Sequence, residues 1–242
     1  MNAVITKETI ARLLKDVKHI IKNPLTEQGI YYIHDDVDML KGYALIIGPS
    51  ETPYFAGNYF FELIYPTDYP HSPPKVKYCT NGNNVRFNPN LYICGKVCVS
   101  LLNTWHGDQW TSCKTISTVL LTLCTLLCKD PLLNEPGVSS GHSDMKSYDE
   151  IIQYSNLEIA VCNIIEKKKS IYMPFFENFY PFVKSNFLKN YDKLLEFAEK
   201  KNTEFNSEAQ NFRTRFYSMN INVNYKKVIE KLKENKILLG DL

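Results

Sequence analysis

The sequence predicts an α+β fold that begins with one helix, continues into a four-stranded antiparallel meander and ends in several helices. Near the start, apolar residues recur at the three- and four-residue spacing of a helix. Between residues 30 and 79, four runs rich in aromatic and β-branched residues alternate with Asp, Gly and Pro clusters, as strands and turns do. Beyond about residue 111, helical periodicity returns.

The first helix is predicted to begin after Thr6, whose hydroxyl can accept a hydrogen bond from a free backbone N–H of the first turn. Its other face is largely basic. The apolar stripe comprises Ile10, Leu13, Leu14, Val17, Ile20 and Ile21. A stripe of this kind packs one face of the helix onto a core.

Four strands are predicted next, at residues 30–33, 43–47, 57–65 and 75–79. Their short, turn-punctuated spacing favours antiparallel neighbours joined by hairpins.

Helices are predicted for the rest of the chain. Thr111 or Ser112 can cap one that reaches about Cys128, with its core face formed by Ile116, Val119, Leu120, Leu123 and Leu127. Three more helices are expected at residues 149–168, 182–201 and 225–239, with a polar loop at 202–211.

Two regions follow from this order: residues 1–145 as a core with its N-terminal helix, and residues 146–242 as a helical continuation and extension packed on it. With 242 residues and 44% hydrophobic content, the chain can bury one good core and part of a second. The aromatic cluster between Phe175 and Phe187 is expected in that core, because each ring gains more from burial than from exposure.

Charge and cysteine content narrow the class of protein. The net charge of +2 is spread evenly along the chain, so we expect no nucleic-acid partner. The most apolar run, residues 119–128, is too short to cross a bilayer, so no membrane association is expected. Seven cysteines and no recognisable signal peptide favour reduced thiols and a cytoplasmic or nuclear location, or the host cytoplasm for a viral protein.

The most informative segment runs from Asn88 to Trp110 and contains Cys98 in an apolar stretch. A buried packing cysteine is the plain alternative. However, the Asn88-Pro89-Asn90 turn upstream can hold a side-chain amide rigidly near the thiol. An amide donor beside a thiol suits acyl transfer, because one donor aimed at a tetrahedral oxyanion can be worth ~3 kcal/mol in the transition state.

This segment resembles the core of the ubiquitin-conjugating enzymes, in which NPN is followed by a cysteine and then a tryptophan. Residues 69–76, YPHSPPKV, resemble the family's YPxxPPKV run. Residues 95–110, which carry a GKVCxSLLxTWxGxxW pattern, and the NEPG run at 134–137 are similar to the C-terminally extended subgroup. Residues 115–126, 157–166 and 187–191 also resemble that subgroup, so the likeness covers most of the chain.

The resemblance implies a fold with an N-terminal helix, a four-stranded meander and C-terminal helices. It also implies that Cys98 accepts ubiquitin, or a ubiquitin-like modifier, as a thioester from an activating enzyme and passes it to a substrate lysine. Asn90 then stabilises the oxyanion or holds its loop, although an asparagine that only closes the turn is the alternative. Asp130, before Pro131 and Leu132, would orient the lysine; a simple surface aspartate is equally compatible. No bound cofactor or metal is implied, since the partner activating enzyme consumes ATP.

Expected partners are the modifier, its activating enzyme, protein substrates and a ubiquitin ligase. Arg12 and Lys15 lie where the first helix is expected to meet the activating enzyme, with ordinary surface charge as the alternative. His71 and Ser112 occupy ligase-contact positions, but they replace the aromatic residue and the proline that many relatives carry there. Standard ligase docking is therefore in doubt.

Three alternatives remain open. The chain could be a catalytically inactive ubiquitin-binding variant of the same fold, or a helical interaction scaffold that docks partners through its C-terminal half. Two C-x3-C pairs, Cys94 with Cys98 and Cys124 with Cys128, could also supply four zinc ligands. The second pair is explained more simply by packing within a helix.

Overall fold

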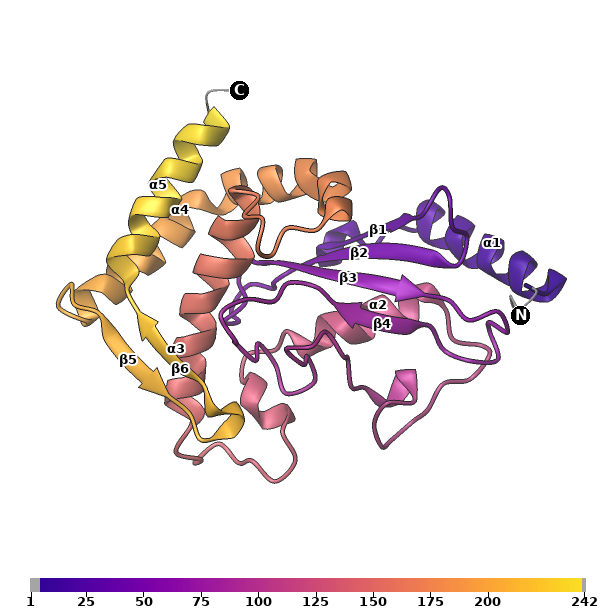
Figure 1. The fold of residues 1–242 in the computed structure, drawn as a ribbon, viewed down its shortest axis with the longest axis horizontal. Coiled ribbons are helices and arrows are strands. Elements are labelled where there is room, and N and C mark those ends of the chain that lie inside the picture. Colours follow the sequence, from indigo (N-terminus) through magenta and orange to yellow (C-terminus); the bar gives the residue numbers. More distant parts are fainter. Residues whose placement is uncertain (1–4, 241–242) are drawn as a thin grey trace.

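The computed structural model describes residues 5–240 and places a four-stranded sheet between two layers of helices (Figure 1). The N-terminal helix lies at one end of the molecule and the C-terminal helices at the other. The elements near the sheet follow the order helix, four strands, helix, which is the order expected from the sequence.

Helix α1 spans Lys7–Lys22 and begins as predicted, because the Thr6 hydroxyl accepts the Thr9 N–H at 3.0 Å. Leu13 and Ile20 of its apolar stripe are buried. The Thr9 hydroxyl donates to the Thr67 carbonyl at 2.8 Å, which fastens the first turn of α1 to the loop after β3.

The sheet is the predicted antiparallel meander, with strand order β1-β2-β3-β4. Its strands are β1 Ile30–His34, β2 Lys41–Ile47, β3 Asn58–Ile64 and β4 Lys75–Tyr78. In the pairing of β2 with β3, Leu45 lies opposite Phe60. All four strands therefore match the sequence prediction to within two residues.

Both faces of this sheet are buried. Ala44 and Phe61 belong to a core shared with α2, whereas Leu45 and Phe60, on the opposite face, belong to a second core built with the C-terminal extension. Side chains alternate between faces along a strand, so one sheet can serve two cores. The second core explains why β2 and β3 carry nearly continuous apolar runs.

Helix α2 spans Ile116–Leu126, and its cap differs from the predicted Thr111 or Ser112. Thr115 is the cap: its hydroxyl accepts the Thr118 N–H, and the Thr118 hydroxyl accepts the Thr115 N–H, both at 3.3 Å. Residues 111–114 instead form a turn whose carbonyls accept hydrogen bonds from α1.

The C-terminal extension contains three long helices and one hairpin. Helix α3, Met145–Ser155, continues as a π-helical segment at Asn156–Asn163; α4 spans Tyr180–Glu204 and α5 spans Tyr225–Gly240. The loop predicted at 202–211 is shorter, at residues 205–209, because α4 extends to Glu204 and strand β5, Gln210–Arg213, begins at Gln210. Strand β5 pairs with β6, Asn220–Val223, a hairpin missed because its short strands carry few apolar residues.

Short 3-10 turns connect these elements, at Thr26–Gln28, Ser100–Leu102, Pro131–Asn134, Pro174–Phe179 and Phe216–Ser218. In the aromatic cluster predicted to be buried, Phe176, Phe179 and Phe187 are at most 1% exposed, as predicted, whereas Phe182 is 40% exposed. Phe176 stacks on Phe60 of β3 with ring centroids 3.7 Å apart. Within residues 5–240, no helix combines the length and apolar character needed to span a membrane.

Candidate active site

Cys98 lies between the sheet edge and the 3-10 turn at Ser100–Leu102. The residue is 2% exposed and its thiol is free of any disulfide. Thr104 closes the chain around it, since its hydroxyl donates to the Val97 carbonyl at 3.0 Å and accepts the Val99 N–H at 3.0 Å. Residues 103–109, which follow this turn, are exposed.

Asn90 and Cys98 are joined by two hydrogen bonds. The Cys98 N–H donates to the Asn90 carbonyl at 2.9 Å, and the Asn90 side-chain amide donates to the Cys98 carbonyl at 2.6 Å. An asparagine amide carries two N–H groups, so this contact uses one and leaves the second. The structure thus brings together the two residues that the sequence placed at the centre of the site.

Asn88 supports the same turn from inside the protein. Its side-chain oxygen accepts the Asn90 N–H at 2.9 Å, and its side-chain amide donates to the Leu126 carbonyl at the end of α2 at 2.8 Å. The residue is completely buried. Its bonds therefore tie the position of Asn90 to the end of helix α2.

Two residues that the sequence analysis missed lie behind this turn. Arg86 donates hydrogen bonds to the carbonyls of Asn88 and Pro89, and Tyr217 of the C-terminal hairpin covers the guanidinium. No spacing in the sequence could reveal this pair, because the two residues lie far apart along the chain and the hairpin itself was not predicted.

Asp130 is exposed and immediately precedes the 3-10 turn Pro131–Asn134. It lines a cavity of about 390 Å³ together with residues of the β2–β3 loop, α3 and α4. Neither Cys98 nor Asn90 lines that cavity. In the part of the chain that the structure describes, no hydrogen bond or ion pair joins Asp130 to either residue, so its role stays a prediction.

The same cavity contains Asp149 of α3. Partial burial, reinforced by the neighbouring Glu150 carboxylate, raises the pKa of Asp149 to about 6. Lys201, which is paired with Glu150 at 2.6 Å, acts in the opposite direction. The junction between core and extension therefore contains a carboxyl group that resists ionisation.

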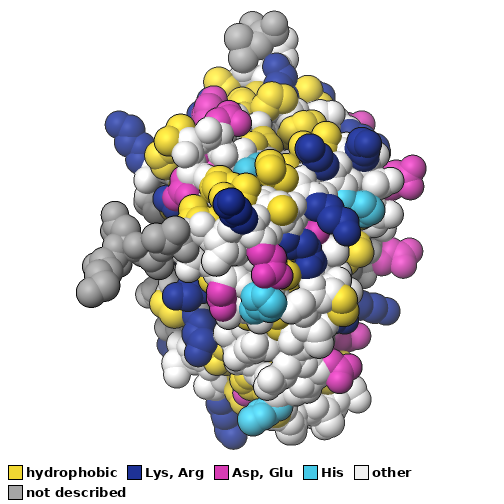
Figure 2. All heavy atoms as spheres, turned by 90° about the vertical axis from the view of Figure 1, so that its right-hand side faces the viewer, with side chains coloured by type: hydrophobic (Ala, Val, Ile, Leu, Met, Phe, Trp, Pro, Cys, Tyr) yellow, Lys and Arg dark blue, Asp and Glu magenta, His cyan; other side chains and the backbone are white. Residues whose placement is uncertain are grey.

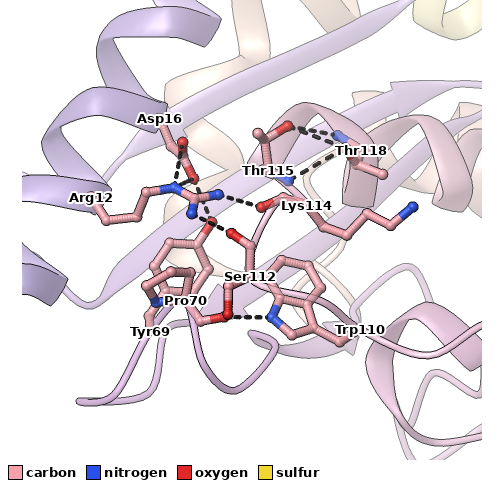
Figure 3. A network of polar contacts seen from close by, with 9 residues as sticks. All are labelled: Arg12, Asp16, Tyr69, Pro70, Trp110, Ser112, Lys114, Thr115 and Thr118. Carbon is pink, nitrogen blue, oxygen red and sulfur yellow. Dashed lines mark hydrogen bonds and ion pairs between the residues drawn. The ribbon is translucent and has the colours of Figure 1, made fainter.

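Arg12 is engaged within the chain (Figure 3). Its guanidinium pairs with Asp16 at 3.0 Å and donates to the carbonyls of Ser112 and Lys114. These contacts bind α1 to the turn before α2. The role expected for Arg12 in binding the activating enzyme stays a prediction. Lys15, the other expected contact, is exposed.

The network extends from α1 toward the active-site loop. The Tyr69 hydroxyl donates to Asp16 at 2.5 Å, and the Trp110 indole N–H donates to the Pro70 carbonyl at 2.7 Å (Figure 3). The Tyr69–Pro70 peptide bond is cis. The Trp110 backbone N–H donates to the Asn103 side chain at 2.9 Å, at the beginning of the loop that follows Cys98.

His71 and Ser112 lie beside this network and both are exposed. The His71 imidazole lies 3.3 Å from the Glu8 carboxylate of α1, so the proposed ligase positions and the first helix share one surface. Figure 2, which views the molecule from the α1 end, shows basic and acidic side chains intermixed with histidines. This face is therefore not a single-sign electrostatic surface.

The four cysteines considered as a zinc site do not form one. Among residues 5–240, no three His, Cys, Asp or Glu side chains come close enough together to hold a metal ion. Of the four, Cys94 is exposed and Cys98 is buried. Cys124 lies on α2 and Cys128 just after it, and both are half-buried. The described residues therefore do not bring these cysteines together as a set of metal ligands.

Comparison with known proteins shows which family the chain resembles. Residues 12–172 match the family model described as "Ubiquitin-conjugating enzyme". The chain is 43% identical to human "Ubiquitin-conjugating enzyme E2 Z" over 164 residues, which cover 66% of this chain and 46% of that protein. It is 40% identical to the Danio rerio protein of the same name over 194 residues, covering 79% of this chain and 57% of that protein.

A third relative is the human "Dual E2 ubiquitin-conjugating enzyme/E3 ubiquitin-protein ligase BIRC6", 39% identical over 153 residues that cover 57% of this chain and 3% of that protein. Among solved structures, human "Ubiquitin-conjugating enzyme E2 G1" aligns with 29% identity and a TM-score of 0.44, over 52% of this chain and 98% of that chain.

The helix, meander and cysteine-bearing loop define the ubiquitin-conjugating fold, and the family match covers more than half of the chain. The chain belongs to the ubiquitin-conjugating enzyme family, and its relatives place it with the extended E2 Z-like members. It spans about half the length of the E2 Z proteins it matches.

Proposed function

We propose that this protein accepts ubiquitin, or a ubiquitin-like modifier, as a thioester on Cys98 and transfers it to a substrate lysine. The observation that carries the proposal is the pair of hydrogen bonds between Asn90 and the backbone of Cys98, which holds an amide donor at a residue whose thiol is free of any disulfide. Family membership and the likeness to E2 Z support it.

The chemistry is two successive acyl transfers. In the first, the Cys98 thiolate attacks the thioester between the activating enzyme and the modifier; a new C–S bond forms at Cys98 and the activating enzyme's cysteine leaves as a thiolate. In the second, a neutral lysine amine attacks the carbonyl. An amide bond forms, the C–S bond to Cys98 breaks, and the proton lost by the amine goes to solvent while the Cys98 thiolate leaves.

Asn90 is proposed to act on the second transfer. One of its side-chain N–H groups is bound to the Cys98 carbonyl, and the other can meet the oxyanion that develops on the modifier's carbonyl oxygen. Asp130 is proposed to orient the incoming lysine, which requires the modifier-loaded enzyme to bring the Lys129–Asp130 segment toward Cys98.

The partners follow from the surfaces around the site. We propose that the activating enzyme meets the α1 face that exposes Lys15, and that a ligase meets the adjoining surface with His71 and Ser112. The protein is proposed to act in a reducing compartment, the cytoplasm or nucleus, without a bound cofactor; ATP is consumed by the activating enzyme.

The test is a thioester assay with activating enzyme, ATP and ubiquitin, read on a non-reducing gel with and without thiol. We expect a thiol-sensitive adduct one ubiquitin larger, which disappears in Cys98→Ala. Cys94→Ala and Cys113→Ala are matched controls, because both residues are exposed cysteines and neither substitution should remove the adduct.

If the protein does not form a thioester with ubiquitin, the assay is repeated with other ubiquitin-like modifiers, each with its own activating enzyme. If folded protein carries none of them, the inactive modifier-binding variant becomes the better description. An adduct that persists in Cys98→Ala would assign the acyl carrier to another cysteine.

A further inference from the structure

The β5–β6 hairpin of the C-terminal extension reaches the back of the Asn88–Asn90 turn. Its tip is anchored to the core by Asp144, whose carboxylate accepts the backbone N–H groups of Arg215 and Phe216 at 2.7 and 2.8 Å. Met219, at the base of the tip, is 3% exposed and its sulfur accepts the Arg86 backbone N–H at 3.3 Å. The tip is thus packed against Arg86.

Arg86 contacts the turn directly. Its guanidinium donates to the Asn88 carbonyl at 3.1 Å and to the Pro89 carbonyl at 2.6 Å, which are the two peptide units before Asn90. The side chain is 9% exposed, and within residues 5–240 no carboxylate pairs with it. A charge this buried needs other partners, because its loss of hydration is costly.

Aromatic rings supply those partners. The Arg86 guanidinium lies 3.4 Å from the Tyr92 ring centroid and 4.8 Å from that of Tyr217. Cation–π contacts of this kind become stronger when the cation is removed from water. Tyr217 is itself held, because its hydroxyl donates to the Glu135 carboxylate.

The backbone of Tyr217 adds an independent observation. Its φ angle is 61°, in the left-handed region that residues with a bulky side chain rarely adopt. Such a conformation persists only where the surroundings hold it, and it is concentrated at functional sites. Here it directs the ring onto Arg86.

We propose that Tyr217 and Arg86 are positioning residues for acyl transfer: the hairpin tip holds the guanidinium against the Asn88–Asn90 turn and so keeps the Asn90 amide aligned beside Cys98. This inference rests on the proposed function of Cys98 and Asn90. The C-terminal extension thereby becomes part of the catalytic apparatus, acting through Asn90 without touching the reacting atoms.

The kinetic test separates loading from discharge. Full-length wild type, Tyr217→Ala and Tyr217→Phe are loaded with ubiquitin, further loading is stopped, and discharge to free lysine is followed at several lysine concentrations. Tyr217→Ala should lower the maximal discharge rate about tenfold, with the half-saturating lysine concentration and the loading rate unchanged. Tyr217→Phe keeps the ring and should restore most of the rate.

Ile221→Ala is the control for a merely structural effect. Ile221 lies on β6 of the same hairpin and packs into both cores, but it makes none of the Arg86 contacts described above. We expect Ile221→Ala to lose about as much unfolding free energy as Tyr217→Ala and to discharge at the wild-type rate. A discharge rate in Tyr217→Ala within twofold of wild type, or an equal loss in Ile221→Ala, overturns the inference.

A second readout does not depend on activity. The side-chain amide resonances of Asn90, assigned by their loss in Asn90→Ala, should shift in ¹⁵N NMR spectra of Tyr217→Ala and stay in place in Ile221→Ala. If wild type carries no modifier but the Asn90 resonances respond to Tyr217, the link stands and the proposed function fails. Unchanged Asn90 resonances in Tyr217→Ala disprove the link.

Discussion

At the scale of single residues, the proposed site depends on the two N–H groups of the Asn90 side-chain amide. The Asn90 amide holds the Cys98 backbone with one N–H, and this contact makes it both a loop brace and a candidate oxyanion donor. The two roles that the sequence left open are therefore compatible in one side chain.

Asn90→Ala should reduce discharge to lysine by about 10²-fold, because one oxyanion donor is worth ~3 kcal/mol, while thioester formation on Cys98 continues. Single-turnover loading and discharge assays measure the two steps separately. Asn134→Ala is a nearby control, since the Asn134 amide donates to the Asn88 side chain at 3.4 Å and, among residues 5–240, no hydrogen bond joins it to Asn90 or Cys98. Equal loss of loading and discharge in Asn90→Ala would indicate a collapsed loop.

Arg12 and Lys15 should respond differently to substitution. Arg12→Ala removes the donor to two carbonyls and the cation paired with Asp16, which keeps its hydrogen bond from Tyr69. We therefore expect the free energy of unfolding to fall by about 1–3 kcal/mol in urea denaturation. Lys15→Ala should leave stability nearly unchanged and slow loading by the activating enzyme, most strongly at low salt. Loading of Lys15→Ala at the wild-type rate at low salt would argue against this contact.

Asp149 predicts a pH dependence of stability. Its pKa in the folded protein, about 6, lies above the ordinary value of 3.8, so folding favours the protonated form. This contribution is present below pH 4 and is lost as pH rises to about 6. Asp149→Asn should therefore gain about 1–2 kcal/mol at pH 8 relative to wild type, after allowance for partial exposure, and gain little at pH 4. Urea titrations at both pH values measure it.

At the scale of elements, local sequence signals determine some features and long-range contacts determine others. Thr6 caps α1 as its sequence context predicts, whereas the cap of α2 is Thr115 because the residues before it bond to Arg12. The hairpin β5–β6 has no strong local signal and is stabilised by what it contacts, including Asp144 and Arg86. The hairpin can therefore be predicted only when the residues that it contacts are known.

The segment Pro174–Phe179 offers a matched test of the second core. Phe176→Ala removes a ring that is fully buried against Phe60, and we expect a loss of about 3–5 kcal/mol in unfolding free energy. Phe182→Ala, whose ring is 40% exposed and stacks on Tyr31, should lose much less. Chemical denaturation of both variants decides this, and similar losses would contradict the assignment of Phe176 to the core.

At the scale of the whole molecule, the sheet lies between two cores and the second consists largely of the extension. A fragment of residues 1–141 would expose Leu45, Phe60 and their neighbours to water. We expect it to aggregate or to unfold readily, because exposed apolar patches of this kind promote association. Light scattering and thioester assays on the fragment test this; a monomeric, fully active fragment would make the extension an accessory.

The sequence by itself determined the N-terminal helix, the meander, the helical periodicity of the later elements and the pairing of Asn90 with Cys98, because each depends on local spacing, capping or a short motif. Tertiary structure decided the two-sided burial of the sheet, the internal engagement of Arg12 and the contact of Tyr217 with Arg86. These features join residues that are distant along the chain, and such contacts cannot be inferred from the local sequence pattern around either residue.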